Sequence, residues 1–156
     1  MGKAKIEIAG GLFAKQDFLR ILIGEVADAA REKRPYAVLA IAPQHFDGED
    51  ITEVMRIAAA CVRDWVRDVD VAGHVDDDII AVGQYSGDCT SAAILAQRLQ
   101  GDLRLRSFHV RSTLWEMGQA CLPDDGASAK ELLAAAIDNA KTSRRRLSAQ
   151  FLPAQP

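Results

Sequence analysis

The sequence predicts an α/β (α+β) sandwich, with helices flanking a mixed central sheet built on a ferredoxin-like βαββαβ core. Segments with apolar residues at helical spacing alternate with short, continuously apolar or β-branched segments, which is the observation that predicts this class. No repeat or low-complexity tract divides the 156 residues, of which 49% are hydrophobic and 26% charged. This composition is too apolar for a disordered chain. We therefore expect one domain over residues 11–146, with a lead-in at 1–10 and a tail at 147–156.

A helix and a buried strand are predicted first. Over residues 16–33 apolar side chains recur at helical spacing, and Pro35 closes the segment. The run from Tyr36 to Ala42 is apolar throughout and is halted by Pro43. A continuous apolar run of this length is typical of a strand covered on both faces of a sheet.

A second helix follows. Asp50 and Glu53 have the spacing of a capping box, and the apolar stripe behind them extends to Trp65. Because Trp65 and Trp115 both fall on apolar-patterned segments, we expect both indoles in the core rather than at a binding surface.

A β-hairpin is predicted next. Residues 69–75 and 79–82 are β-prone runs, separated by Asp76, Asp77 and Asp78. Consecutive aspartates suit a tight turn, and their carboxylates are expected in solvent rather than around a metal ion.

The last third of the chain is predicted to form helix, strand and helix. Thr90 is placed to cap a helix that stops at Gly101, and a strand is expected over residues 108–117. Ser128 and Glu131 form a second capping box, which opens the final helix.

Charge and cysteine content exclude several classes of protein. With 19 Lys+Arg against 22 Asp+Glu the net charge is 19 − 22 = −3, which argues against broad binding of nucleic acid. No apolar stretch is long enough to span a membrane. Cys61, Cys89 and Cys121 are odd in number and in no metal-binding spacing, so we expect buried thiols and a cytoplasmic location.

Four segments together resemble the GGDEF domain of diguanylate cyclases. In the order and spacing of that family they are residues 11–18 (GLFAKQDF), the strand from Tyr36 with Phe46, residues 69–82 (VDVAGHVDDDIIAV), and residues 118–126 followed by 131–133. The resemblance covers the chain from about residue 11 to about residue 146. It implies the fold of nucleotidyl cyclase palm domains.

The residues that hold metal and substrate in the family are replaced. Ala42 stands where the family has its first metal carboxylate, and Gln44 replaces a second aspartate. The segment after Phe46, which carries guanine recognition in the family, is several residues shorter here. Mg²⁺ prefers carboxylate oxygens, and an alanine methyl offers none.

The signature turn itself is degenerate. It reads Asp76, Asp77, Asp78, Ile79, Ile80 in place of Gly-Gly-Asp-Glu-Phe, so only Asp78 matches. Ile79 replaces the glutamate that completes the metal site, and two added aspartates would repel a triphosphate. The resemblance thus implies no catalysis, no bound Mg²⁺ and no other cofactor.

The inhibitory site of the family is retained in pattern. Its RxxD motif reads Arg67 to Asp70 here, and the second arginine that the family draws from the next helix matches Arg98. An arginine fork can hold guanine O6 and N7 or a phosphate, and a carboxylate can accept from guanine N1–H. These residues therefore predict a site for cyclic di-GMP. The alternative is a surface ion pair between Arg67 and Asp64, of little energetic value.

Two functions follow from these observations. The first is a cytoplasmic cyclic di-GMP receptor without catalytic activity, acting on a homodimer or a partner protein of an exopolysaccharide, motility or regulatory system. The second is a scaffold that dimerises or docks proteins without nucleotide. An active cyclase is disfavoured by Ala42 and Ile79. Neither function involves nucleic acid or a membrane span.

Overall fold

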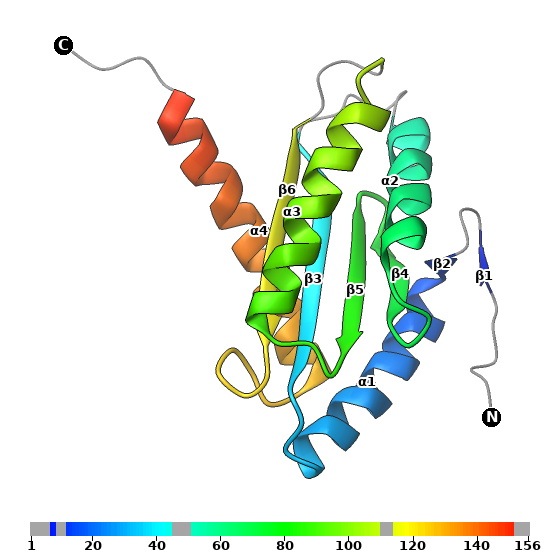
Figure 1. Cartoon of the computed structure of the whole chain (residues 1–156), viewed down its shortest axis with the longest axis vertical. Coiled ribbons are helices and arrows are strands. Elements are labelled where there is room, and N and C mark those ends of the chain that lie inside the picture. The colour runs from blue at the N-terminus through cyan, green and yellow to red at the C-terminus, as the bar shows by residue number, and fades with distance from the viewer. Residues whose placement is uncertain (1–6, 9–11, 45–50, 110–113, 152–156) are drawn as a thin grey trace.

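A six-stranded mixed sheet with helices on both faces forms the molecule (Figure 1). The computed structural model describes residues 7–8, 12–44, 51–109 and 114–151. Its elements, in chain order, are β1 (Glu7–Ile8), β2 (Leu12–Phe13), α1 (Lys15–Arg31), β3 (Tyr36–Pro43), α2 (Ile51–Trp65), β4 (Val71–Asp76), β5 (Ile79–Tyr85), α3 (Cys89–Arg106), β6 (Trp115–Cys121) and α4 (Ala129–Phe151). None of the helices in these ranges combines the length and the apolar character that crossing a membrane requires.

The predicted ferredoxin-like core is confirmed. The segment from β3 to β6 follows the order βαββαβ, and its four strands lie in the antiparallel order β4-β5-β3-β6. β1 and β2 extend the sheet beyond β4, and β2 runs parallel to β4 through the pair Phe13 and Gly73. These two strands were not predicted, because two residues each are too few to show an alternating pattern.

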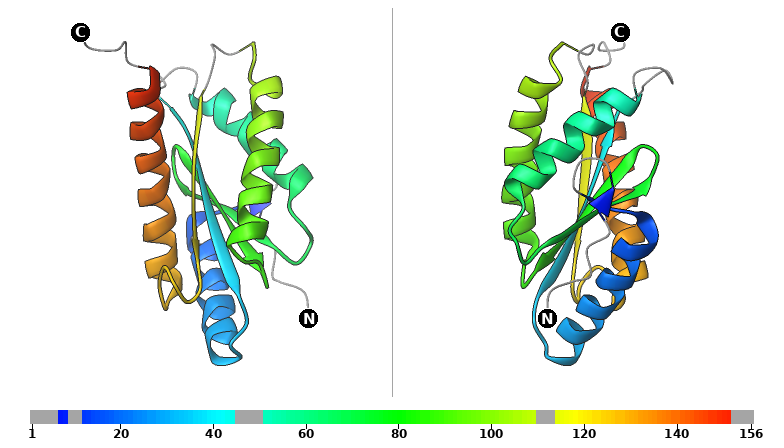
Figure 2. Two further views of the ribbon diagram at one scale, coloured as in Figure 1. Left: turned by 60° about the vertical axis from the view of Figure 1, so that its left-hand side comes forward. Right: turned by 90° about the vertical axis from the view of Figure 1, so that its right-hand side faces the viewer.

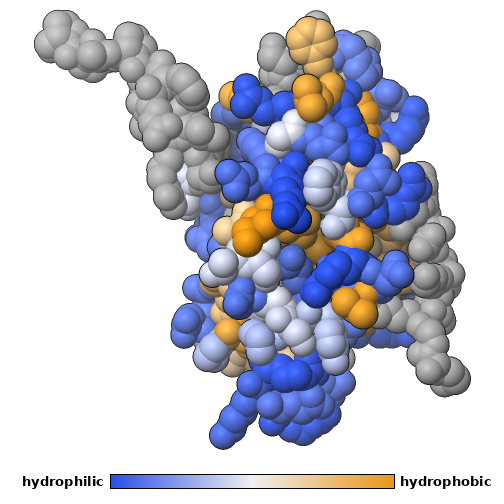
Figure 3. Space-filling view, viewed as in Figure 1, coloured by the Kyte–Doolittle hydropathy of each residue, from blue (hydrophilic) through white to orange (hydrophobic). Residues whose placement is uncertain are grey.

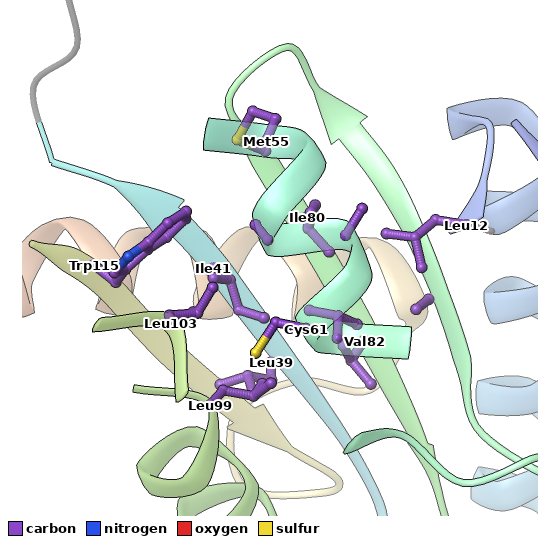
Figure 4. Close-up of a cluster of buried hydrophobic side chains, with 14 of the residues drawn as sticks. Leu12, Leu39, Ile41, Met55, Cys61, Ile80, Val82, Leu99, Leu103 and Trp115 are labelled. Atoms are coloured by element: carbon purple, nitrogen blue, oxygen red, sulfur yellow. The ribbon is translucent and has the colours of Figure 1, made fainter. Parts of the chain in front are cut away.

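Helices α1 and α4 lie on one face of the sheet, and α2 and α3 on the other (Figure 2). Strand β3 is buried on both faces, as predicted. Its Leu39 and Ile41 pack toward α2 and α3, where Trp115 also lies (Figure 4), while Val38 and Ala40 pack toward α1 and α4. Alternating sides along one strand thus supply two hydrophobic cores.

Helix α3 begins earlier and ends later than predicted. Its N-cap is Asp88, not Thr90, and Asp88 and Ser91 form a reciprocal capping box. The helix also continues through Gly101 to Arg106. Leu99 and Leu103 on either side of the glycine are fully buried, and their burial outweighs the roughly 1 kcal/mol that a helical glycine costs.

Strand β6 is correspondingly displaced from the predicted range 108–117. Phe108 is exposed just after α3, residues 110–113 lie outside the described residues, and the strand spans Trp115–Cys121. β3 extends one residue beyond the predicted Ala42 and ends at Pro43, which lies opposite Trp115 at the end of the β3–β6 ladder. The indole of Trp115 is buried, as predicted.

The predicted cap at Ser128 is confirmed. Ser128 Oγ accepts a hydrogen bond from the backbone N–H of Glu131 at 3.2 Å, and the Glu131 carboxylate accepts from Ala127 N–H at 3.0 Å. The predicted cap at Asp50 and the aromatic residue Phe46 lie outside the described residues, as do the last five residues of the tail.

The prediction of three free thiols is wrong. Cys89 and Cys121 form a disulfide with a Cα–Cα distance of 5.8 Å, which joins the start of α3 to the end of β6. These cysteines are 32 residues apart, and only the sheet topology brings them together. Cys61 is a free, buried thiol. Burial is the main cause that raises its pKa to about 12, and the negative charge of Asp102 is the second.

Helix α4 packs directly against β6 at Gly118. A Cβ atom added there would collide with the backbone of Ala136 and Ala140. We expect Gly118→Ala to lower the free energy of unfolding by about 1–3 kcal/mol, because the helix must move away from the strand. Urea denaturation followed by circular dichroism measures this.

Gly101→Ala is the matched control, since nothing lies within 4 Å of the added methyl on α3. Relief of a helical glycine should raise the stability by about 0.5–1 kcal/mol. Equal effects of the two substitutions would contradict the contact between α4 and β6.

The disulfide fixes the number of titratable thiols. In protein purified without reductant, we expect an aromatic disulfide reagent at pH 8 to find no accessible thiol in the native state, since Cys61 is buried and protonated. One thiol should appear in denaturant and three after reduction. Three thiols in denaturant without reduction would contradict the disulfide.

Candidate functional site

The RxxD segment forms the tight connection between α2 and β4. It begins two residues after Trp65 and ends at Asp70, directly before Val71 opens the strand. The backbone N–H of Asp70 donates to the carbonyl of Arg67 at 2.9 Å, which closes the turn. The three-residue spacing between the arginine and the aspartate of the motif therefore matches a turn closed by a hydrogen bond between residues i and i+3.

The carboxylate of Asp70 is buried and fully engaged by the protein. Its side chain is 2% exposed. One oxygen accepts from the backbone N–H of Arg67 at 3.1 Å and from Arg67 Nε at 3.2 Å. The other accepts from Arg67 Nη2 at 3.0 Å and from the backbone N–H of Tyr85 at 3.1 Å. Two bonds at each oxygen use the acceptor capacity of a carboxylate.

The guanidinium of Arg67 is held flat against this carboxylate. Besides its two bonds to Asp70, Nη2 donates to the carbonyl of Tyr85 at 2.8 Å. The side chain is nevertheless 58% exposed, and within the described part of the chain Nη1 has no hydrogen-bond partner. One edge of the guanidinium is thus fixed and the other faces outward.

The alternative pairing of Arg67 with Asp64 is wrong. Asp64 instead forms an ion pair with Arg106 on α3, at 2.8 Å. The same guanidinium also pairs with Asp102, likewise at 2.8 Å. Hydrogen bonds from Arg106, followed by one from Trp65, lower the pKa of Asp102.

Arg67 and Arg98 line one surface pocket, of about 280 Å³. We call it the arginine pocket. It lies between the α2–β4 turn, the end of β5 and the first half of α3, and its lining is Trp65, Arg67, Asp70, Gln84, Ser86, Gly87, Ser91, Ile94, Leu95 and Arg98. The structure therefore brings together the three residues that the sequence singled out. Small-molecule sites begin at about 300 Å³, so the pocket is large enough for part of a nucleotide.

Trp65 is the lining residue that sequence reasoning placed wrongly. Its indole is 40% exposed rather than buried. The indole N–H donates to Asp102 at 2.8 Å, and the guanidinium of Arg98 lies 5.9 Å from the ring centroid. The sequence position of Trp65 could have indicated its place in the pocket, because Trp65 ends α2 only two residues before Arg67.

The degenerate signature forms the turn of the β4–β5 hairpin, as predicted. Asp76, Asp77 and Asp78 are all exposed, and Asp76 accepts a hydrogen bond from the backbone N–H of Asp77 at 2.8 Å. Ile80 is buried in the core under α2 and α3, and Ile79 packs against the core on the opposite face. The two isoleucines thus serve the two hydrophobic cores.

A second, smaller pocket of about 80 Å³ lies beside this hairpin. We call it the hairpin pocket; it is lined by Ala40, Ala42, Pro43, Asp78, Ile79, Glu116, Ile137, Ala140 and Lys141. Ala42 and Glu116 are cross-strand neighbours. Sequence reasoning did not single out Glu116, which is a buried carboxylate on β6.

Comparison with known proteins gives matches in structure and none in sequence. No protein-family model matches the chain, and no curated protein matches it either. The GGDEF domain of DgcB from Caulobacter crescentus, solved in complex with cyclic di-GMP, superposes with a TM-score of 0.80 at 15% identity, covering 94% of this chain and 90% of that one.

Two structures from Pseudomonas aeruginosa agree. The FimX GGDEF domain has a TM-score of 0.75 at 16% identity and covers 94% of this chain and 96% of its own. The diguanylate cyclase SiaD, solved with its activator SiaC, has a TM-score of 0.80 at 16% identity, covering 92% of this chain and 60% of that one. The chain therefore has the fold of a GGDEF domain, as its sequence motifs predict.

Proposed function

We propose that this chain is a GGDEF-fold domain without catalytic activity that binds cyclic di-GMP in the arginine pocket. Arg67 and Arg98 would contact the ligand, and Asp70 would hold Arg67 in place. The observation that carries the proposal is the convergence of the two arginines, from separate elements, on one pocket. Binding would regulate a homodimer or a partner protein.

The chemistry of the pocket suits an anionic guanine nucleotide. A guanidinium donates two parallel hydrogen bonds to guanine O6 and N7 or to phosphate oxygens. Because Asp70 and the carbonyl of Tyr85 already orient Arg67, little side-chain entropy is lost when the ligand binds. The carboxylate of Asp70 has no acceptor capacity left for a guanine, so its role is positioning.

Related structures support both parts of the proposal. The DgcB domain was solved in complex with cyclic di-GMP, and SiaD was solved with an activator protein. A GGDEF fold is thus compatible with this ligand and with a bound partner. Whether the partner belongs to an exopolysaccharide, motility or regulatory system stays a prediction.

Catalytic inactivity is supported by the hairpin pocket. Ala42 and Ile79 offer no metal ligand there, and the ammonium group of Lys141 disfavours a second cation. Its volume of about 80 Å³ is far below the roughly 300 Å³ at which small-molecule sites begin. The chain would therefore require no Mg²⁺.

A docking scaffold is the second candidate. The C-terminal end of α3 exposes two large apolar side chains, Leu105 and Phe108, the latter with 84% of its surface. Apolar side chains exposed in this way favour contact with another protein.

A cytoplasmic location also stays a prediction. The structure contains a disulfide between Cys89 and Cys121, and disulfides are uncommon in proteins of a reducing compartment.

Isothermal titration calorimetry with cyclic di-GMP tests the receptor function. We expect a dissociation constant in the micromolar range, about −8 kcal/mol. Arg98→Ala should weaken binding by about tenfold or more, because it removes a charged fork of hydrogen-bond donors. Arg67→Lys should weaken binding by a similar factor, because it keeps a positive charge beside Asp70 but removes Nη1, the one guanidinium nitrogen that the described part of the chain leaves for a ligand.

Arg104→Ala is the matched control for Arg98→Ala, since it removes an exposed charge from the same helix away from the pocket. It should bind as the unmodified protein does. GTP with Mg²⁺ should yield no pyrophosphate. Absence of heat with cyclic di-GMP from folded protein would leave the scaffold as the function.

Asp70 should matter for stability more than its neighbour in the same motif. Asp70→Ala leaves buried N–H groups of Arg67 and Tyr85 without an acceptor, and we expect a loss of about 1–3 kcal/mol in the free energy of unfolding. Asp68→Ala removes an exposed carboxylate and should change stability by less than about 0.5 kcal/mol. Urea denaturation distinguishes them, and equal midpoints would refute the anchoring role.

A further inference from the structure

We propose that Trp65 is a stacking platform for a purine base of the ligand in the arginine pocket. This inference rests on the proposed function and adds to it a binding residue outside the RxxD motif and its second arginine. The indole lines the pocket together with both arginines and keeps 40% of its surface exposed. A partly exposed indole beside two cations provides both interactions that a nucleotide offers, base stacking and charge.

The surroundings of the pocket favour a flat apolar ligand face. The exposed side chain of Ile94 is part of the lining, and the exposed residues Val69 and Tyr85 are next to lining residues along the chain. In the view from the α2 and α3 side, hydrophobic patches lie within otherwise hydrophilic surface (Figure 3). A bare phosphate would leave this apolar surface in water, whereas a base would cover it.

The orientation of the indole is fixed before any ligand arrives. Its N–H donates to Asp102 at 2.8 Å, and Asp102 is held by Arg106 at 2.8 Å. Arg106 also binds Asp64 near the end of α2, so the network joins both helices. A ring that is held in place loses little freedom on binding, and preorganisation of this kind strengthens binding.

The position of Arg98 completes the arrangement. Its guanidinium lies 5.9 Å from the indole centroid, at the outer limit of a cation–π contact. Because the guanidinium lies over the ring, a base that stacks on this face would displace Arg98 from the ring toward the edge of the base, with Arg67 bordering the same pocket. One guanine nucleotide can then stack on Trp65 and accept hydrogen bonds from the arginines at guanine O6 and N7 or at its phosphate oxygens.

Intrinsic fluorescence and calorimetry with cyclic di-GMP test the inference. The chain has two tryptophans, and Trp115 is 1% exposed in the core. Stacking on a purine quenches indole emission, so we expect quenching that saturates with the calorimetric dissociation constant. Trp65→Leu should raise that constant by about fivefold to about a hundredfold, and Trp65→Phe, which keeps an aromatic face, should restore most of the affinity.

Phe108→Leu is the matched control, because it removes an exposed aromatic ring outside the pocket. It should leave affinity and quenching unchanged. If Trp65→Leu binds as tightly as the unmodified protein while Arg98→Ala does not bind, the stacking inference is wrong and the receptor function stands. If the unmodified protein itself does not bind, both are wrong.

The test does not depend on the folding of a variant. Should Trp65→Leu fail to fold by circular dichroism, the unmodified protein decides alone. Saturation with cyclic di-GMP that leaves its emission unchanged would overturn the inference, and quenching that saturates would support it.

Discussion

The buried carboxylate of Asp70 is the interaction on which the candidate site depends. It accepts the backbone and side chain of Arg67 and the backbone N–H of Tyr85, so it joins the α2–β4 turn to the end of β5. A buried charge is stable only when it is paired and hydrogen-bonded, and here every bond it needs comes from the protein. The RxxD spacing is therefore a structural requirement of the turn. Asp70 thus serves both the fold and the candidate site. The exposed side of the Arg67 guanidinium, which Asp70 does not bind, is the part that a ligand can reach.

The hairpin pocket and the arginine pocket differ in chemical character. Around the hairpin pocket, Ala42 and Ile79 extend the hydrophobic surface of the sheet, and Ile80 is buried in a core. Around the arginine pocket, charged side chains persist in defined hydrogen bonds. Apolar replacement of ligand residues costs a fold little and can strengthen a core, whereas an arginine held beside a buried carboxylate cannot be lost without leaving that carboxylate unpaired. Under the proposed function, this asymmetry explains how the fold would lose turnover and keep a second site.

Much of the fold could be predicted from sequence because periodicity reports burial. The alternation along β3 and the stripes of α1 and α2 follow directly from the apolar pattern. The errors have a common origin in tertiary contacts. Gly101 lies inside α3 because Leu103 beyond it is buried, and Cys89 meets Cys121 because the sheet brings their elements together. Trp65 belongs to an apolar stripe, but the stripe reaches the surface where α2 ends. Local pattern cannot reveal which end of a helix emerges from the core.

The size of the arginine pocket bears on how binding would act at a distance. Under the proposed function, a pocket of about 280 Å³ would hold part of a cyclic dinucleotide and leave the rest outside. The outer nucleotide would then be exposed at the surface of the domain. A second protein surface that covers this nucleotide would bind the occupied domain better than the empty one. By thermodynamic linkage, this difference in affinity is enough to couple ligand binding to partner binding. Regulation would therefore require no change in the fold of the domain. A receptor of this kind needs rigidity at the pocket, which the bonds of Asp70 and Asp102 supply.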